Sequence, residues 1–350
     1  MIMTDEKLNN IIESLGLSVL QRANNKDLWD ETLNKTPYKP VIYSNSSLDY
    51  QLAYQRGHGG SWRDISLIIY WDNKPIALWP LSFSVKGEQS MFTSHGLPVL
   101  PPLFVADSPS ISQKRITKSC LDLANAISVA AKLNTWMSGE SFIDSLGMSD
   151  WQVESMKRDS TCDLHHELYL DLRQNLIEIK RNFRRCYKSL ISTGSRIWVV
   201  GVLNSTEKEG VWQEFRELHL KVSGRVTRSD ETWAMQLRDI EQQRAFLVWL
   251  RSDSGEMVGG GLFNFTSDEG TYAVGAYNRS FFDKPMGHAV QYKAIEELKE
   301  RGVLWYKLGA RFFGTEKPTP TDKEISISEF KQGFSSHFFP HYCLTHKVSE

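Results

Sequence analysis

The sequence predicts an α/β (α+β) fold with two similar halves, each a mixed, mostly antiparallel sheet flanked by helices. Three observations lead to this prediction. The 350 residues, 41% hydrophobic and 24% charged, suffice for two globular domains. Short apolar stretches alternate with amphipathic ones, which indicates strands mixed with helices. The same order of elements also appears twice: a helix, three antiparallel strands, a long helix, a strand, a short helix and a strand.

In the first half, this order begins near residue 45 with a helix over residues 48–56. A hairpin follows, with strands over 65–71 and 75–84 that turn at Asp72, Asn73 and Lys74. Prolines interrupt the apolar residues 91–105, which are therefore expected to be part strand and part loop. The remaining elements are a helix over 108–133, a strand over 135–137, a helix over 151–158 and a strand over 164–172.

The second half repeats the order after a basic amphipathic helix that is predicted over residues 173–193. Its strands are predicted over 196–203, 245–251, 257–265, 271–277, 304–308 and 338–347, and its helices over 205–221, 229–243, 286–301 and 326–333. We therefore divide the chain into residues 1–172, a linker helix 173–194 and residues 195–350. The basic residues of the linker have two interpretations. They form an ordinary solvated helix face, or they border a cleft that binds an anionic substrate.

The most informative local pattern lies between the strand 271–277 and the helix that follows it. Lys284 is followed three residues later by Gly287, and Ala289 comes two residues after that. Small residues at a helix start leave its free backbone N–H groups uncovered, so an anion such as a phosphate can approach them. A tight turn is an equally good explanation of the glycine.

With this loop, the second half resembles the GNAT acyltransferases, whose pyrophosphate loop has a basic residue or Gln, two positions, Gly, one position, then Gly or Ala. The tandem arrangement is similar to the FemAB-like branch, over residues 45–345. Further resemblances are the Asn-Phe-Arg-Arg core of the linker, Lys307-Leu308-Gly309, and Glu329-Phe330-Lys331-Gln332-Gly333-Phe334. Two features depart from the branch: Lys307 stands where Asp is usual, and the first half lacks the loop.

The resemblance implies that acyl-CoA is a cosubstrate and that no cofactor is permanently bound. Its pantetheine arm would lie against the strand near residues 274–277. The cosubstrate-binding residues that it implies are Val274, Lys284, Gly287, His288, Ala289 and Val290. The candidates for proton transfer are His288, Tyr306 and Tyr277. Water can replace a dedicated base, and each of the three side chains also has an ordinary structural interpretation.

Arginine forks suit the phosphates of an acceptor. Arg225 and Arg228 resemble positions that contact such phosphates in the branch, and Arg279 and Arg311 flank the same region. Trp62 follows a glycine-rich loop and is a candidate for stacking on a base. Ordinary surface arginines and a core tryptophan are the alternative interpretations.

Three functions follow as hypotheses. The favoured one is transfer of an acetyl or hydroxybutyryl group from acyl-CoA to a nucleotide-linked amino sugar for surface polysaccharide synthesis; the resemblance favours a dTDP-3-amino-3,6-dideoxyhexose. The alternative is a FemAB-type, aminoacyl-tRNA-dependent peptidoglycan bridge ligase, which needs a basic surface for its nucleic acid. The net charge of −1 counts against that alternative. The third is a binding module without catalytic activity.

Composition limits the location and the metal chemistry. No apolar run reaches the ~20 residues of a membrane-spanning helix, and the polar start lacks the core of a signal peptide. The four cysteines form no CxxC pair, which is typical of free thiols in a reducing cytoplasm. His341 and Cys343 share a strand face from which His346 points away, so no metal site is expected.

Overall fold

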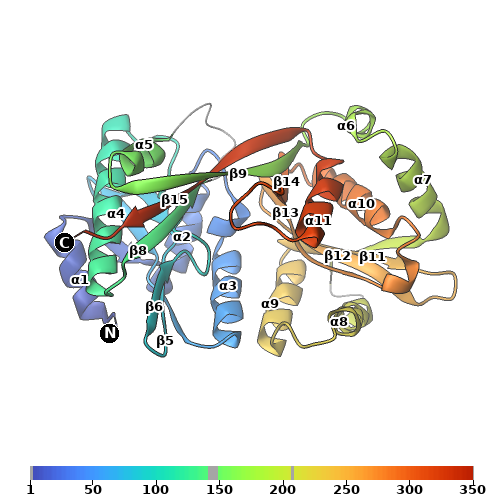
Figure 1. The fold of residues 1–350 in the computed structure, drawn as a ribbon, viewed down its shortest axis with the longest axis horizontal. Helices are drawn as coiled ribbons and strands as arrows, with labels where there is room; N and C mark the ends of the chain where they lie inside the picture. The colour runs from blue at the N-terminus through green and yellow to red at the C-terminus, as the bar shows by residue number, and fades with distance from the viewer. Residues whose placement is uncertain (1–2, 141–148, 206–208, 350) are drawn as a thin grey trace. The chain divides into compact units, whose positions relative to one another are not determined.

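The computed structural model describes residues 3–140, 149–205 and 209–349 (Figure 1). The chain divides into two compact units. Unit 2 is His166–Phe339, and unit 1 combines Met1–His165 with Pro340–Glu350. The predicted linker segment 173–194 thus lies within unit 2, and residues 340–350, which we had placed in the second domain, belong to unit 1.

The described residues of unit 1 form two small antiparallel sheets and five α-helices, besides the strands at its border with unit 2 in the sequence. The four-stranded sheet has the order β1 (Ser18–Gln21), β3 (Leu67–Trp71), β4 (Lys74–Trp79), β7 (Leu103–Phe104). The three-stranded sheet has the order β2 (Ser61–Asp64), β5 (Ser82–Lys86), β6 (Gln89–Thr93). The helices are α1 (Asp5–Ser14), α2 (Lys26–Leu33), α3 (Asn45–Gly57), α4 (Ser110–Ala130) and α5 (Asp150–Met156). The elements before residue 45 were not predicted.

The predicted hairpin of unit 1 is confirmed at its turn and wrong in its second strand. Asp72 and Asn73 both have positive φ, 48° and 61°, as a tight two-residue hairpin turn requires. The second strand, predicted as one over residues 75–84, breaks after Trp79 into β4 and β5, which lie in different sheets. Pro80 stands at the break and cannot donate to a sheet ladder.

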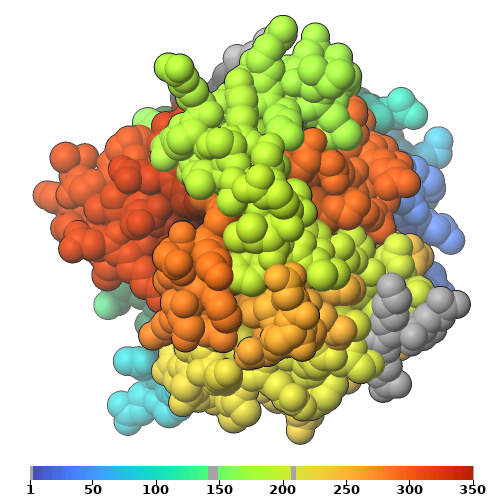
Figure 2. All heavy atoms as spheres, turned by 90° about the vertical axis from the view of Figure 1, so that its right-hand side faces the viewer, coloured from blue at the N-terminus to red at the C-terminus, as the bar shows by residue number. Residues whose placement is uncertain are grey.

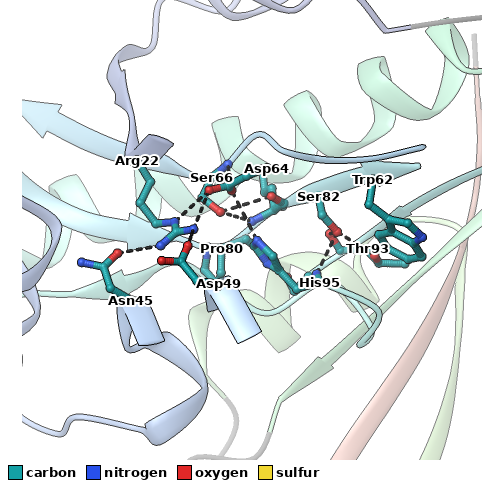
Figure 3. Close-up of polar contacts among 12 residues, drawn as sticks. Arg22, Asn45, Asp49, Trp62, Asp64, Ser66, Pro80, Ser82, Thr93 and His95 are labelled. Carbon is teal, nitrogen blue, oxygen red and sulfur yellow. Dashed lines mark hydrogen bonds and ion pairs between the residues drawn. The ribbon is translucent and has the colours of Figure 1, made fainter. Parts of the chain in front are cut away.

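A buried polar cluster joins several elements of unit 1 (Figure 3). The Arg22 guanidinium donates to Asp64 Oδ2 at 2.9 Å, to Asp49 Oδ1 at 2.7 Å and to Asn45 Oδ1 at 2.6 Å. The Nε2 atom of His95 lies 3.3 Å from Asp64 Oδ1. Burial alone would raise the pKa of Asp64, but the hydrogen bond from His95 and the charge of Arg22 hold it well below its usual range. The cluster therefore ties β2, α3 and the turn at Arg22 together.

Unit 2 is built on six neighbouring strands of one eight-stranded sheet, in the order β10-β11-β12-β13-β14-β9. The strands are β10 (Val199–Leu203), β11 (Ala245–Arg251), β12 (Met257–Phe265), β13 (Glu269–Tyr277), β14 (Trp305–Arg311) and β9 (Ser160–Asp171). All neighbours are antiparallel except β13 and β14, which run parallel. The predicted hairpin of β11 and β12 is confirmed.

Helices cover both faces of this sheet. They are α6 (Leu176–Asn182), α7 (Tyr187–Ile197), α8 (Glu209–Ser223), α9 (Asp230–Glu241), α10 (Met286–Glu300) and α11 (Asp322–Gln332). One core joins α7 and α10 to the sheet, and a second core joins α8 and α9 to it. Figure 1 shows α8 and α9 on one face of the sheet and α10 on the other.

The prediction of one linker helix over residues 173–193 is wrong, because the segment forms α6 and α7. Phe183 ends α6 with an extended backbone (ψ 157°), and its buried ring packs 5.1 Å from that of Phe334. The Arg184 N–H then donates to the carbonyl of Gly333. Burying Phe183 thus redirects the chain, and the basic residues are distributed over α6, α7 and the turn between them, a segment that is yellow-green in Figure 2.

The two sequence segments of unit 1 are joined through β8 (Thr135–Glu140). This strand pairs antiparallel with Tyr342–Lys347 of β15 (His337–Lys347). His346 donates or accepts at 2.8 Å from Ser138 Oγ and stacks on Trp136 with ring centroids 3.8 Å apart. Of the helices that the structure describes, none combines the length and apolar character of a membrane-spanning segment.

Candidate active site

The open edge of β13 is the structural basis of the candidate site. Strand β13 bonds to β14 only over Glu269–Thr271, so from Tyr272 onward this edge has no strand partner among the described residues. A cavity of about 800 Å³ lies beside this edge, within unit 2. Its lining residues come from β13, α10, α11 and the turns next to them: Val222, Tyr272, Gly275, Tyr277, Arg279, Phe282, Gly287, Gln291, Lys323, Ser326, Ile327, Phe330 and Lys331.

A β-bulge places two tyrosines of β13 on the cavity side. Leu262 of β12 pairs with Val274 and the next residue, Phe263, pairs with Tyr272, so Ala273 is an extra residue. The extra residue shifts the alternation of side chains, and Tyr272 therefore lies on the same side as Tyr277, with the two hydroxyl oxygens 3.4 Å apart.

Glycines provide the space for these rings. A Cβ atom at Gly261 would lie 2.8 Å from the Tyr272 ring, and one at Gly259 would lie 2.8 Å from the Tyr277 ring. A Cβ at Gly275 would overlap the Tyr272 hydroxyl. Gly259 and Gly261 of β12 thus allow the close approach of the two tyrosines.

The tyrosines of the site are hydrogen-bond donors and not bases at neutral pH. Burial raises the pKa of Tyr272 to about 12, although its hydrogen bond with Tyr277 opposes this. Burial also raises the pKa of Tyr277 and of Tyr306 well above the usual value. All three hydroxyls therefore keep their protons.

Lys331 is the one lining residue whose pKa is shifted toward neutrality among those that the structure describes. Burial lowers its pKa, and no hydrogen bond or ion pair of its amine is found within the described residues. Its Nζ lies close to Gly309, where a Cβ atom would be 3.2 Å away and where φ is +102°. A desolvated lysine of this kind exchanges its proton more readily near neutral pH than an ordinary lysine.

The helix that carries Lys331, α11, is stabilised at its N-terminus by side-chain capping. Thr321 and Glu324 form a reciprocal capping box at the N-terminus of α11. One helical face then brings Ser326, Ile327 and Phe330 to the cavity beside Lys331. The sequence motif around Lys331 is quoted above for its resemblance only, and Lys331 was not predicted as a site residue.

Lys307, which replaces the usual Asp of the branch, has a structural partner in this chain. Its Nζ lies 2.8 Å from Glu167 Oε2 on the neighbouring strand β9. Burial alone would lower the pKa of Lys307, but the effects of Glu167, Tyr169 and Glu269 together outweigh burial and raise it. This ion pair accounts for the lysine within the sheet, outside the lining of the cavity.

Gln291 and Tyr306 form a buried pair at the cavity wall. The Tyr306 hydroxyl donates to Gln291 Oε1 at 2.6 Å, and Tyr306 is fully buried. Gln291 is 3% exposed and lines the cavity one helical turn after Gly287. Tyr306, predicted as a proton donor, thus contacts the cavity through Gln291. Gln291 was not predicted, although the spacing of four residues from Gly287 on a helix is a signal for it.

His288, the other candidate for proton transfer, lies in an aromatic cluster. Its ring centroid is 4.5 Å from that of Tyr187 and 5.0 Å from that of Phe330. Burial, with a smaller effect of the Arg184 charge, lowers the pKa of His288 to about 4, so the ring is neutral at pH 7. His288 is not among the residues that line the cavity, whereas Tyr277 is.

The predicted pyrophosphate loop is partly covered by packing. Lys284 is exposed, 5.5 Å from the Trp198 ring and 5.3 Å from the Phe281 ring. Gly287 lines the cavity, and a Cβ there would lie 3.1 Å from Phe330. Ala289 faces Gly194 of α7, where a Cβ would approach it to 3.0 Å. The side chains of Val274 and Val290 are buried in the cores.

The predicted acceptor residues fall in different places. Arg225 and Arg228 line a second cavity of about 180 Å³ at the turn between α8 and α9, and Arg279 lines the main cavity. Arg311 is 8% exposed and its guanidinium donates to Gln332 and Ser328. Trp62 is buried in β2 of unit 1, where its Nε1 donates to the Gly59 carbonyl.

The main cavity combines tyrosine and glutamine hydrogen-bond donors, the cations Arg279 and Lys323, the desolvated amine of Lys331 and apolar walls. Its lining contains no carboxylate, and the described residues contain no group of three or more His, Cys, Asp or Glu side chains placed to hold a metal ion. Such an arrangement suits a neutral, polarisable group such as an acyl carbonyl, with the amine available for proton transfer.

Comparisons with known proteins establish the fold. No protein-family model and no curated protein matches the sequence. The crystal structure of FemX superposes with a TM-score of 0.67 and 14% identity, over 93% of this chain and 96% of that chain. L-PGS from Bacillus licheniformis superposes with a TM-score of 0.54 and 15% identity, over 99% of this chain and 93% of that chain. The C-terminal DUF2156 domain of an Agrobacterium fabrum protein superposes with a TM-score of 0.57 and 10% identity, over 93% of this chain and 92% of that chain. The chain therefore has the fold of FemX, a mixed α/β arrangement of the class that the sequence predicts.

Proposed function

We propose that the protein is an N-acyltransferase whose reaction takes place in the cavity of unit 2. The observation that carries the proposal is the desolvated amine of Lys331, which lines a cavity without carboxylates beside the edge of β13. An acyl carbonyl bound there would meet the donors of the cavity wall.

The chemistry of transfer assigns a role to Lys331. The acceptor amine forms the new C–N bond at the carbonyl carbon, and the bond from that carbon to the leaving group breaks. Neutral Lys331 takes the proton that the attacking nitrogen loses, and the resulting ammonium returns it to the leaving group. Tyr272 and Tyr277 remain protonated throughout and contribute donors.

For the donor, we propose an acyl-CoA thioester. The unpartnered edge of β13 from Tyr272 to Tyr277 offers backbone groups to an extended pantetheine arm. The exposed Lys284 at the start of α10 supplies a positive charge for the diphosphate. An acetyl or hydroxybutyryl group is the acyl group that we favour.

A second candidate donor is an aminoacyl ester on tRNA, because one surface of unit 2 is basic. The segment 176–197, which contains α6, α7 and the turn between them, carries one acidic residue, Glu178, and six basic ones: Lys180, Arg181, Arg184, Arg185, Lys188 and Arg196. Packing of Gly194 over Ala289 also covers part of the predicted pyrophosphate loop. This candidate predicts binding of charged tRNA that weakens steeply with salt.

For the acceptor, we propose the amine of a nucleotide-linked sugar, with a dTDP-3-amino-3,6-dideoxyhexose favoured. The support is the arginine-lined cavity at the end of α8: Leu220 lines it, and Val222 of the same turn lines the main cavity. Arg225 and Arg228 would contact the diphosphate, with the sugar amine reaching toward Lys331.

The test measures free thiol and acylated product. The chain is incubated with acetyl-CoA or 3-hydroxybutyryl-CoA and a panel of nucleotide-linked amino sugars, and in parallel with charged tRNA and amine acceptors. We expect transfer with at least one CoA thioester. It should be lost in Lys331→Met and kept in the control Lys293→Met, because Lys293 of α10 pairs with Glu297 and does not line the cavity. Transfer from charged tRNA alone would select the second candidate, and no transfer from any donor would refute the proposal.

A further inference from the structure

Gln291 lines the cavity, and its side-chain oxygen accepts a hydrogen bond from the buried hydroxyl of Tyr306, which leaves its amide nitrogen available to a ligand. We infer that the Gln291 carboxamide donates the hydrogen bond that polarises the acyl carbonyl, and that Tyr306 is the residue that positions it. The inference rests on the proposed acyl transfer and names the part of the site that would bind the reacting oxygen.

The orientation of the amide follows from Tyr306. A buried phenol must donate its proton to an acceptor, and Gln291 Oε1, at 2.6 Å, is the acceptor found for it within the described residues. Because the oxygen is used in this way, the two N–H donors of the amide are directed elsewhere. No protein acceptor for them is found among the described residues.

The position of Gln291 suits this role. It lies one turn into α10 from Gly287, so the two residues share the helix face that lines the cavity. A bulky residue at position 287 would stand over this face, and the glycine leaves it accessible, with Phe330 beside it. A carbonyl at this face also lies within the cavity that Lys331 lines.

The Gln291 amide and the Lys331 amine have different roles: the amide polarises the carbonyl, and the amine transfers the proton. Negative charge develops on the carbonyl oxygen as the C–N bond forms, and a fixed donor in a water-poor cavity stabilises that charge with no reorganisation. Gln291 does not titrate, so its contribution is independent of pH, whereas that of Lys331 follows its protonation.

The first experiment uses the donor and acceptor pair that the wild-type chain turns over. We expect Gln291→Leu to lower kcat about 10²–10³-fold with little change in KM. Tyr306→Phe, which frees the amide to rotate, should lower kcat about two- to tenfold. Neither change should move the pH profile, which would distinguish them from Lys331→Met. Gln236→Leu is the control, a buried glutamine of α9 that does not line the cavity.

The second experiment does not depend on turnover. S-butyryl-N-acetylcysteamine with a ¹³C-labelled thioester carbonyl is bound without an acceptor, and its carbonyl stretch is measured by infrared difference spectroscopy. We expect a band at lower frequency than in water for the wild type and for Gln236→Leu, and loss of that shift in Gln291→Leu.

The outcomes separate the two proposals. Transfer by the wild type that survives in Gln291→Leu, or a carbonyl band with the same shift in that variant, would overturn the role of Gln291 and leave the proposed function intact. Absence of the shift from the wild type would also overturn it. A failure of transfer with every donor would count against the proposed function itself.

Discussion

Lys331 illustrates how one side chain can be adapted to chemistry at a cost to folding. Its amine is desolvated and has no ion-pair partner within the described residues, so the protonated form is disfavoured in the folded state. The lowered pKa means that the unfolded chain binds this proton more strongly than the folded chain. Stability therefore falls as the pH drops from the ordinary lysine pKa of about 10.4 toward the lowered one.

Replacing Lys331 with Met should therefore raise the melting temperature or leave it unchanged at pH 7, while transfer falls by at least about 10²-fold. In the wild type, kcat/KM should rise with pH through the lowered pKa of Lys331, because the neutral amine is the base. Calorimetry and a pH profile of kcat/KM measure both effects. A variant that is destabilised yet fully active would contradict the assignment.

Asp64 is a residue with the opposite character, since its charge stabilises unit 1. Asp64→Asn should lower the free energy of unfolding by about 3 kcal/mol at pH 7, because buried Arg22 loses the more buried of its two carboxylate partners. The pKa of Asp64 is held low in the folded state, so this contribution is present above the unfolded value of about 3.9 and is lost as the pH falls below it.

Urea unfolding at pH 7 and near pH 3 measures this difference. Asp159→Asn is the matched control, because its ion pair with Lys347 is exposed and should change stability by less than about 0.5 kcal/mol. Equal effects of the two substitutions at pH 7 would show that the buried cluster contributes no more than a surface pair.

At the scale of elements, β12 and β13 depend on glycines that create the cavity wall. Gly275→Ala should destabilise the chain by about 1–3 kcal/mol and lower transfer, because the new methyl group occupies the place of the Tyr272 hydroxyl. Gly210→Ala is the control: it lies in α8 with open space around its Cβ position, and should stabilise by about 0.5–1 kcal/mol. Thermal unfolding and transfer assays test both, and a neutral Gly275→Ala would show that Tyr272 is free to move.

The same strands show where sequence reasoning stops. Alternation along β13 places Tyr277 correctly at the cavity, but puts Tyr272 on the opposite face with Val274. The bulge at Ala273 reverses this, and no local residue pattern marks it. Likewise, the periodicity of residues 173–193 predicts one helix, whereas a tertiary contact of Phe183 with Phe334 ends α6. The predicted start of α9 is confirmed with Ser229 as its cap, because the determinants of a helix cap are local.

For the site, three predicted residues line the cavity: Gly287 from the loop pattern, Arg279 from the acceptor arginines and Tyr277 from the proton-transfer candidates. Lys331 and Gln291 were missed because their importance comes from burial and from convergence of α10 and α11. A lysine in a motif of Glu, Phe and Gln gives no sign in the sequence that its amine will be desolvated.

At the scale of the molecule, the two compact units are not two consecutive halves of the sequence. The residues from Pro340 onward fold with unit 1, and Tyr342–Lys347 pair with β8. Deleting residues 340–350 should therefore expose the amides of Thr135–Glu140 to hydrogen exchange and lower the melting temperature of unit 1. His346→Ala, which removes the stack on Trp136 and the contact with Ser138, should give a smaller effect in the same strand. Unchanged protection of β8 after the deletion would contradict this role of β15.

The placement of β15 has a consequence for biosynthesis. A ribosome that makes this chain releases all of residues 1–165 long before it makes the strand that pairs with β8, and the whole of His166–Phe339 emerges in between. The unit translated first is thus the last to be completed, and in the interval the edge of β8 is open to chaperones or to a neighbouring nascent chain.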